Sequence, residues 1–366
     1  MSNVFLVGDV GGTNTNLALA RHDQSGIHLI KKARFSTKQE KSLLDPIKRF
    51  LMEARAAGTA ESIDFCCISG AGPVLPDESI PLTNAPWSIR ALEISSELNT
   101  PVKLINDFTA LSYAVTLLDY RDSEAVTQLP HTDGSLYAPR DGIMLVIGAG
   151  TGLGVGFVDR SGDQIKAFPS EGGHSEMPCF DDLSRAIHRW LSDRYSYAAG
   201  AEIAISGQGI ANIFKFICSD EFDTGLLSSD YEDEVPRAAL EAGLSDRARN
   251  ILASRRLDWP ANIALHAEDD AFCALTMELF TRLYALKAAN LASIFLPPGG
   301  VWLAGGISSK NEPWLIKNAR FMRWFEKNYA QHIRQFLAHT PVMIVKNYDI
   351  SLLGAAVAAQ QFSAHA

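Results

Sequence analysis

Alternating stretches of apolar and polar residues predict an α/β chain that opens on three strands. Apolar runs at 4–7 and 17–20 flank a glycine-rich turn, which predicts two tightly joined strands, and a third strand follows at 27–35. Residues 42–57 then carry apolar side chains three and four positions apart, the spacing of an amphipathic helix. An apolar run at 62–69 predicts a buried strand, so this part reads as strands, helix, strand.

A later strand-to-helix junction carries a polar pair. Residues 102–105 predict a brief strand that ends in Asn106 and Asp107, and 108–118 continue as a helix. Because α/β folds place chemistry at the carboxyl ends of their strands, this pair is a candidate site.

The opening pattern returns in the middle of the chain. Residues 143–147 and 155–158 predict two strands around the turn Gly148–Gly154, in which glycine occupies every second position. Strand, glycine turn and strand thus occur twice, which indicates two related α/β halves.

The last third predicts one long helix and one exposed segment. Apolar residues on one face predict a helix over about 268–293, and a strand at 301–304 runs into Gly305 and Gly306. The acidic, poorly periodic stretch from Ser219 to Trp259 is interpreted as a surface insertion.

Length and composition allow two domains and exclude a nucleic-acid partner. The 366 residues are 47% hydrophobic and 20% charged, enough for two domains that each bury a core. The formal net charge is −9, and Lys and Arg are not concentrated anywhere, whereas binding a phosphate backbone needs a basic cluster.

Cysteine usage and the N-terminus indicate a cytoplasmic protein. The five cysteines form no CxxC pair, which predicts reduced thiols of an intracellular protein. The first residues lack the basic region of a signal peptide, and no apolar run approaches the roughly 20 residues that span a bilayer. We expect no membrane partner.

The two glycine turns are candidate phosphate sites. Glycine lets several backbone N–H groups converge and lets the chain approach a phosphate closely, so two such turns could hold a polyphosphate. The Gly148–Gly154 turn is no Rossmann signature, because no helix pattern follows it, and no Gly-Lys-Ser or Gly-Lys-Thr occurs. The alternative is a glycine-rich hairpin without a ligand.

Three groups of polar residues admit a chemical and a structural interpretation. Asp9 could hold Mg²⁺ through water beside Thr13 and Asn14, or it could cap an Asx-type turn. Asp107 could take a proton from a hydroxyl nucleophile during phosphoryl transfer, or the Asn106-Asp107 pair could cap a helix.

The segment from Glu171 to His174 is the third group. Its carboxylate and imidazole, placed around two glycines, suit adjacent sugar hydroxyls, or they could be ordinary polar surface. A metal site is disfavoured, because Cys179 adds only one further candidate ligand.

At this point the motifs resemble those of the bacterial-type glucokinases, of the actin, hsp70 and hexokinase-like superfamily. Leu6–Asn14 and Gly148–Gly154 are similar to that family's two phosphate motifs. Leu303–Ile307 is similar to its adenosine motif, and Leu352–Ala356 to its second connecting helix.

The sugar motifs also occur in the family's order, and the resemblance implies the roles of individual residues. These motifs are Leu82–Trp87, Ile105–Ala110, Glu171–His174, and Ala201-Glu202 with Ser206-Gly207. The implied glucose ligands are Asn84, Asn106, Asp107, Glu171, His174 and Glu202, with Asp107 as the base toward the 6-hydroxyl. The implied ATP contacts are Asp9, Gly11, Gly12, Thr13, Asn14, Gly150, Thr151, Gly152, Gly305 and Gly306, and Asp9 is also the candidate for Mg²⁺.

Two absences favour the zinc-free glucokinase branch over the related ROK proteins. ROK proteins carry a cysteine-rich zinc motif after their Glu-x-Gly-His, whereas residues 173–179 hold only Cys179. ROK repressors also add an N-terminal helix-turn-helix, whereas this chain begins on its first strand. A repressor is therefore not expected.

The resemblance implies an α/β protein with two RNase H-like (actin-like ATPase) domains and an interdomain cleft. Residues 1–110 plus about 350–366 would form the small domain, and 111–349 the large one, with the acidic insertion near 219–259. Glucose would bind in the cleft with MgATP, giving glucose 6-phosphate and ADP in glycolysis. Relatives commonly form dimers, so a homodimer is expected. A kinase for another hexose and a non-catalytic sugar sensor are the alternatives.

Overall fold

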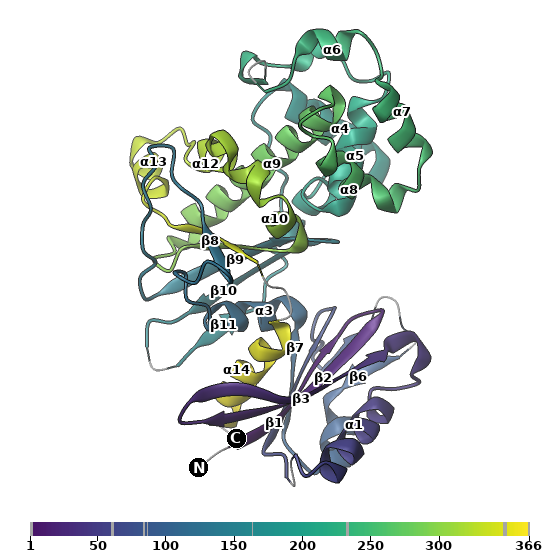
Figure 1. Ribbon diagram of the computed structural model, residues 1–366, viewed down its shortest axis with the longest axis vertical. Helices are drawn as coiled ribbons and strands as arrows, with labels where there is room; N and C mark the ends of the chain where they lie inside the picture. Colours follow the sequence, from purple (N-terminus) through teal and green to yellow (C-terminus); the bar gives the residue numbers. More distant parts are fainter. Residues whose placement is uncertain are drawn as a thin grey trace. The chain divides into compact units, whose positions relative to one another are not determined.

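The computed structural model describes two compact units, and each is treated separately below (Figure 1). The described residues are 3–59, 62–82, 85, 87–162, 164–231, 234–346 and 350–364. Unit 1 comprises Met1–Asp119, Gly156–Pro169 and Asn347–Ala366, and unit 2 comprises Tyr120–Val155 and Ser170–Lys346. The segment 156–169, which the sequence division assigned to the larger domain, clusters with unit 1 because Ile165 and Ala167 pack against its core.

Unit 1 is built on a five-stranded mixed sheet in the order β3-β2-β1-β4-β7. The strands are β1 (Asn3–Val10), β2 (Asn14–Asp23), β3 (Gly26–Ser36), β4 (Phe65–Gly70) and β7 (Val102–Asn106). β1 runs antiparallel to β2 and parallel to β4, and β4 runs parallel to β7. The three opening strands and the two later ones confirm the sequence predictions.

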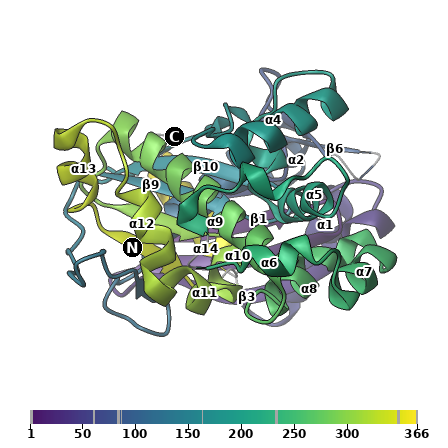
Figure 2. The same cartoon turned by 90° about the horizontal axis from the view of Figure 1, so that it is seen from above.

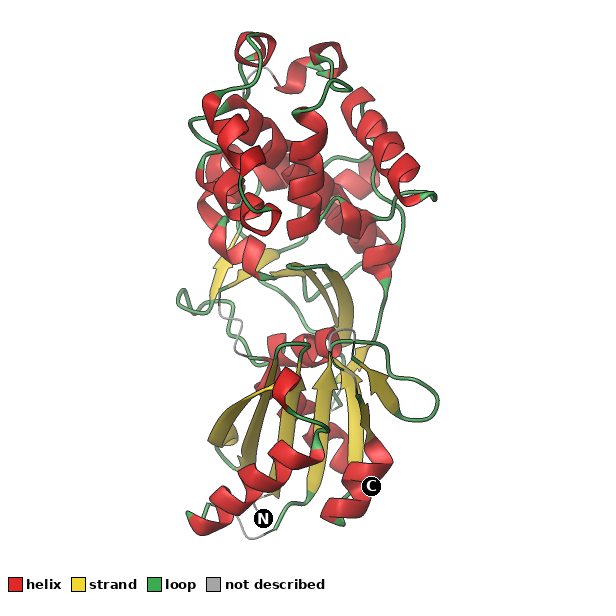
Figure 3. Cartoon of the chain, turned by 90° about the vertical axis from the view of Figure 1, so that its right-hand side faces the viewer, coloured by secondary structure: helices red, strands yellow, loops and turns green. Residues whose placement is uncertain are grey.

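Alternation along β1 gives this sheet two apolar faces. Leu6 lies in one buried cluster and Val7 in the other, because successive side chains of a strand point to opposite faces. The first cluster includes residues of α1 (Leu44–Ala56) and α2 (Ala91–Leu98). The second includes residues of α3 (Asp107–Val115) and α14 (Ser351–Ser363), so helices cover both faces (Figure 3).

The last helix of the chain packs in unit 1, as the sequence predicts. α14 lies against α3 and β1, which come much earlier in the sequence. Gly354 permits this approach, because a Cβ there would lie 1.8 Å from the Ala110 carbonyl oxygen.

The second sheet has six strands in the order β11-β10-β9-β12-β13-β8. The strands are β8 (Val126–Gln128), β9 (Ile143–Ala149), β10 (Leu153–Asp159), β11 (Lys166–Phe168), β12 (Val301–Ala304) and β13 (Val342–Val345). As in unit 1, a neighbouring pair around a glycine turn is followed by parallel strands, here β9, β12 and β13. This shared order bears out the internal repeat.

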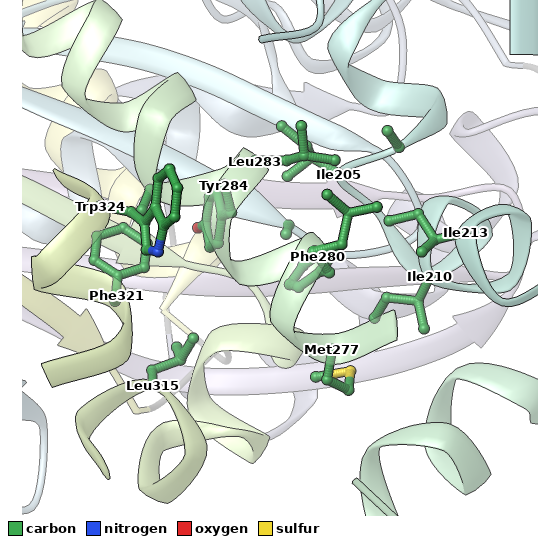
Figure 4. Packing of buried hydrophobic residues seen from close by; sticks show 14 of the residues in the cluster. Ile205, Ile210, Ile213, Met277, Phe280, Leu283, Tyr284, Leu315, Phe321 and Trp324 are labelled. Atoms are coloured by element: carbon green, nitrogen blue, oxygen red, sulfur yellow. The ribbon is translucent and has the colours of Figure 1, made fainter. Parts of the chain in front are cut away.

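A 25-residue helix, α9 (Ala271–Phe295), is the centre of the helical part of unit 2 (Figure 2). It is buried on nearly all sides, against α5 (Gly207–Ile217) and α12 (Arg320–Phe325) among others. Figure 4 shows Phe280 and Tyr284 of this helix among apolar side chains from several elements. The Tyr284 hydroxyl donates to the Ile147 carbonyl at 3.1 Å, which ties the helix to β9.

The remaining described elements are short. They are β5 (Ser79–Pro81), β6 (Ser88–Arg90), α4 (Asp182–Tyr195), α6 (Arg237–Glu241), α7 (Asp246–Ala253), α8 (Trp259–Leu265), α10 (Gly306–Lys310), α11 (Glu312–Ile316) and α13 (Gln331–Leu337), with seven 3₁₀ turns at 37–39, 172–174, 201–203, 224–226, 229–231, 256–258 and 317–319. Within the described residues, no helix combines the length and apolarity needed to cross a membrane.

The acidic segment differs from the expected surface insertion. It folds into short helices whose apolar side chains, Tyr231 and Val235 among them, join the core of unit 2. Glu234 bonds Arg320 and Arg323, each at 2.7 Å, and the Arg282 guanidinium donates to the Asp230 carbonyl. Burial raises the pKa of Glu234, but the two arginines outweigh it and hold that pKa below its ordinary value. Glu234 therefore pairs with cations of α12, and a cation of α9 holds the backbone of the segment, although both helices lie far away in the sequence.

Candidate active site

The first glycine turn joins β1 to β2 and is held by a buried threonine. The Gly11 N–H donates to the Asn14 carbonyl at 2.9 Å, which closes the turn. Thr37 is fully buried, and its hydroxyl donates to the Gly11 carbonyl at 2.8 Å while its N–H donates to the Thr13 carbonyl at 3.0 Å. Two bonds from one side chain and its backbone thus fix the shape of the turn.

Asp9 precedes this turn, and three polar groups surround its carboxylate. Ser351, the first residue of α14, donates to Oδ2 at 3.0 Å, and Ser69 at the end of β4 donates to Oδ1 at 3.4 Å. Asn16 donates to Oδ2 at 3.5 Å. The bonds come from other elements, so Asp9 is more than the local turn cap considered above.

The second glycine turn, between β9 and β10, contacts α5 and Glu202. The Gly150 N–H donates to the Gly152 carbonyl, and the Gly207 N–H at the start of α5 donates to the Gly150 carbonyl, both at 2.8 Å. Glu202 accepts the Leu153 N–H at 2.9 Å, and a Cβ on Gly152 would lie 2.5 Å from that carboxylate.

At two of the predicted phosphate-contact glycines, Gly150 and Gly306, a larger side chain would meet no steric obstacle inside the protein. A Cβ on Gly150 or Gly306 would meet no atom within 4 Å, and neither backbone has a positive φ. Gly305 is different, because its φ is 104° and a Cβ would lie 2.2 Å from the Ala149 carbonyl oxygen. Open space over Gly150 and Gly306 is what close approach of a ligand to the backbone needs.

Glu171, His174 and Glu202 come together in unit 2. The His174 Nε2 lies 3.7 Å from Glu171, and its Nδ1 lies 4.0 Å from Glu202. Glu171 and His174 are about two-thirds exposed and Glu202 one-third, at 68%, 64% and 32% of the side chain. The imidazole between two accessible carboxylates offers donors and acceptors to a polyhydroxylated ligand.

The two glycines between Glu171 and His174 are set by packing. A Cβ on Gly173 would lie 1.8 Å from the Leu153 carbonyl oxygen, and one on Gly172 would lie 3.2 Å from Val155. The loop therefore packs directly on the first residues of β10, where this strand leaves the second glycine turn.

Asn106 and Asp107 occupy successive positions at the start of α3. Asn106 is the N-cap of α3, since its Oδ1 accepts from Phe108 at 2.8 Å and from Thr109 at 3.3 Å, while its Nδ2 donates to the Gly72 carbonyl at 3.2 Å. Asp107 is the exposed first residue of the helix. Capping thus describes Asn106, while the Asp107 Oδ1 also accepts the Phe108 N–H at 2.8 Å.

The remaining predicted residues lie where their motifs suggest or outside the described part. Thr13 and Thr151 are exposed on the two turns, and Gly12 is half-buried. Asn84 lies outside the described residues. Among the described residues, Asp9, the first turn, Asn106 and Asp107 belong to unit 1, and the other predicted site residues belong to unit 2.

Sequence reasoning did not single out Thr37, Ser69 or Ser351, although each contacts a predicted site residue. Thr37 is a polar residue directly after β3, and Ser69 precedes the Gly-Ala-Gly at 70–72, which are weak local signals. Their partners lie 26, 60 and 342 positions away, so only the fold brings them together. In the described chain, no group of three or more His, Cys, Asp or Glu residues is arranged to hold a metal ion.

Comparison with known proteins decides the family, because the glucokinase family profile matches residues 6–362. The chain belongs to the glucokinase family. A glucokinase of Nostoc sp. (strain PCC 7120) is 32% identical over 363 residues, covering 97% of this chain and 98% of the relative. A glucokinase of Synechocystis sp. (strain PCC 6803) is 31% identical over 368 residues, covering 98% of each. Family membership over nearly the whole chain makes the protein an ATP-dependent glucose kinase.

Solved structures confirm the predicted actin-like ATPase fold of two α/β domains. A glucokinase from an Antarctic psychrotroph has a TM-score of 0.75 at 23% identity, covering 98% of this chain and 99% of that one. A ROK-family glucokinase from Streptomyces griseus, solved with glucose and AMPPNP, has a TM-score of 0.56 at 18% identity, covering 98% and 100%. The fold is thus common to glucokinases and ROK proteins.

Proposed function

We propose that the protein transfers the γ-phosphoryl group of ATP to the 6-hydroxyl of glucose with Asp107 as the general base. The observation that carries this proposal is the exposed position of Asp107 at the start of α3. Asn106 caps the helix, and the Asp107 Oδ1 also accepts the Phe108 N–H at 2.8 Å, which holds the carboxylate at the end of β7. A carboxylate at the carboxyl end of β7 suits a group that accepts a proton as a hydroxyl attacks phosphorus.

Glu171, His174 and Glu202 are the proposed ligands of the sugar hydroxyls. Their mutual distances of 3.7 and 4.0 Å support this role, because each group lies near another yet keeps part of its surface exposed. A sugar contact by Asn106 stays a prediction beside its capping role, and the same holds for Asn84.

The two glycine turns and Gly305-Gly306 are the proposed ATP contacts. Open space over Gly150 and Gly306 supports this assignment. Asp9 fits Mg²⁺, because its oxygens are hard ligands held by serine hydroxyls and an amide. Mg²⁺ held through water at Asp9 would neutralise charge on the phosphate oxygens.

The finer classification is also a proposal. We assign the chain to the zinc-free branch because Cys179 is the sole cysteine of the 173–179 segment. Five unpaired cysteines support a cytoplasmic location, and the reaction suits glycolysis. The expected homodimer rests on the resemblance and is measured by light scattering.

Substitution of Asp107 tests the central proposal. Asp107→Asn should lower kcat by about 10² to 10⁴, the usual contribution of a general base, as measured by coupled ADP release with a hexose panel. The free energy of unfolding should change by less than about 0.5 kcal/mol, because the side chain is exposed.

Asp45→Asn is the matched control, since Asp45 is also an exposed carboxylate in the first turn of a unit 1 helix. It should leave kcat unchanged. A near-normal kcat in Asp107→Asn would refute the assignment, whereas equal losses in both variants would indicate a general effect of charge.

A further inference from the structure

Lys287 is a buried lysine whose ammonium group donates two hydrogen bonds to the segment that carries His174. It belongs to α9 and is 5% exposed. Its Nζ donates to the Ser175 hydroxyl at 2.5 Å and to the Glu176 carbonyl at 3.3 Å. Within the described residues, no carboxylate oxygen lies within 4.0 Å of this ammonium group, so it is not one half of a structural ion pair.

Burying an ammonium group without a carboxylate partner is costly. Burial disfavours the charged form and lowers the pKa of Lys287, and the charge of Glu176 opposes that shift only in part. Hydrophobic packing of α9 would be served as well by leucine or methionine at this position. The contacts of the ammonium are therefore the feature that distinguishes lysine here.

Those contacts complete the support of the loop from Glu171 to Glu176. On one side Gly173 packs against the Leu153 carbonyl of β10. On another side Ala201 donates its N–H to the Ser175 carbonyl at 2.8 Å. Within the loop, the Ser175 hydroxyl donates to the Gly172 carbonyl at 2.7 Å, so the hydroxyl that accepts from Lys287 also closes the turn.

We propose that Lys287 is a positioning residue for sugar recognition, acting through Ser175 to hold His174 in its place. It does not touch the substrate. The ammonium orients the Ser175 hydroxyl, that hydroxyl fixes the turn at 172–175, and the turn aims the imidazole between Glu171 and Glu202. The inference rests on the proposed role of His174 in binding glucose.

Loss of this contact should weaken glucose binding more than any other step. A loop that is free to shift must be ordered by the sugar, which raises KM for glucose while the chemistry of bound substrate is retained. We expect Lys287→Met to raise KM for glucose on the order of tenfold, with kcat within about threefold and KM for ATP unchanged.

Ser175→Ala and Ser175→Thr test the same contact without altering the core. Ser175 is exposed, so Ser175→Ala should fold normally and raise KM for glucose as Lys287→Met does. Ser175→Thr retains the hydroxyl and should restore most of the affinity. In the double variant the two effects should be strongly non-additive, because each removes the same bond.

Glucose-dependent thermal stabilisation gives a second readout that is independent of turnover, since a ligand stabilises the folded state in proportion to ln(1 + [L]/Kd). Lys215→Met, which removes an exposed lysine of α5, is the control and should change neither quantity. His174→Ala tests the proposed sugar site separately from the role of Lys287, because it should raise KM for glucose whether or not Lys287 acts through the loop.

If His174→Ala leaves glucose affinity intact, the proposed sugar site is wrong. If His174→Ala weakens glucose binding but Ser175→Ala does not, the positioning role is wrong. Additive effects of Lys287→Met and Ser175→Ala would also overturn it, as would loss of stability in Lys287→Met with an unchanged KM for glucose.

Discussion

Two glycines of unit 2 should respond to the same substitution in opposite ways. In Gly173→Ala the new Cβ would lie 1.8 Å from the Leu153 carbonyl oxygen, and in Gly150→Ala it would meet nothing within 4 Å. The first glycine is therefore required by packing inside the protein. The second has no such packing requirement, and we propose that the space over it receives the phosphates of ATP.

The magnitude for Gly173→Ala follows from that distance. Because Cβ atoms are not found closer than 3.0 Å to such an atom, the loop must move away by at least 1.2 Å, the difference between 3.0 and 1.8 Å. The obstacle is backbone of β10 and cannot rotate aside. Such overpacking costs about 1–3 kcal/mol, or about 2–4 °C in Tm for each kcal/mol in a unit of this size.

Gly150→Ala should behave differently. The Cβ of alanine would meet no neighbour there and the backbone φ is not positive, so the free energy of unfolding should change by less than about 1 kcal/mol. Any change should be a stabilisation, because alanine lowers the conformational entropy of the unfolded chain. A methyl group over the second turn should nevertheless raise KM for ATP, because the phosphates can no longer reach the backbone N–H groups.

Thermal unfolding and initial rates at varied ATP and glucose separate the two effects. Gly173→Ala should lose stability and glucose affinity, and Gly150→Ala should lose ATP affinity alone. The reasoning would be refuted if Gly173→Ala unfolded at the wild-type temperature, or if Gly150→Ala kept the wild-type KM for ATP.

Two further predictions concern acid stability and thiol reactivity. Partial burial raises the pKa of Glu326, but hydrogen bonds from His131 and Thr132 outweigh it and lower that pKa. The stability that these bonds contribute is fully present above the pKa of the unfolded state, near 4.5, and is lost as pH falls through the lower pKa of the folded state. The excess unfolding free energy of wild type over Glu326→Gln should therefore shrink below about pH 4.5 in urea titrations, and a constant difference would contradict the pairing. Cys179 is the exposed cysteine, so a thiol reagent should label it first. Cys179→Ser should remove the fast phase of labelling, and an unchanged fast phase would contradict this.

The local pattern of the sequence determined most of the secondary structure. Alternating and helical spacings predicted the strands of unit 1 and the long helix, which runs over Ala271–Phe295 against the predicted 268–293. These signals depend on neighbours within a few residues, which is why they can be read without the fold. The repeated strand, glycine turn and strand likewise predicted the shared strand order of the two sheets.

The acidic segment shows what local pattern could not determine. The acidic, poorly periodic segment was interpreted as a surface insertion, yet the side chain of Glu234 within it is buried and bonds Arg320, which lies 86 residues away. Pairing with distant cations leaves no trace in the local sequence, so only the tertiary structure decides that such a residue is buried.

The candidate site divides in the same way. Motif order predicted Asp107, Glu171 and His174 as site residues, because they lie on short glycine-rich or strand-end segments that are recognisable one by one. The contacts that hold candidate site residues and their loops depend on the fold alone. Ser351 bonds Asp9 across 342 positions of the sequence, and Lys287 bonds Ser175 across 112. Local motifs can thus suggest candidate site residues, whereas the contacts that hold those residues depend on which distant segments the packing brings together.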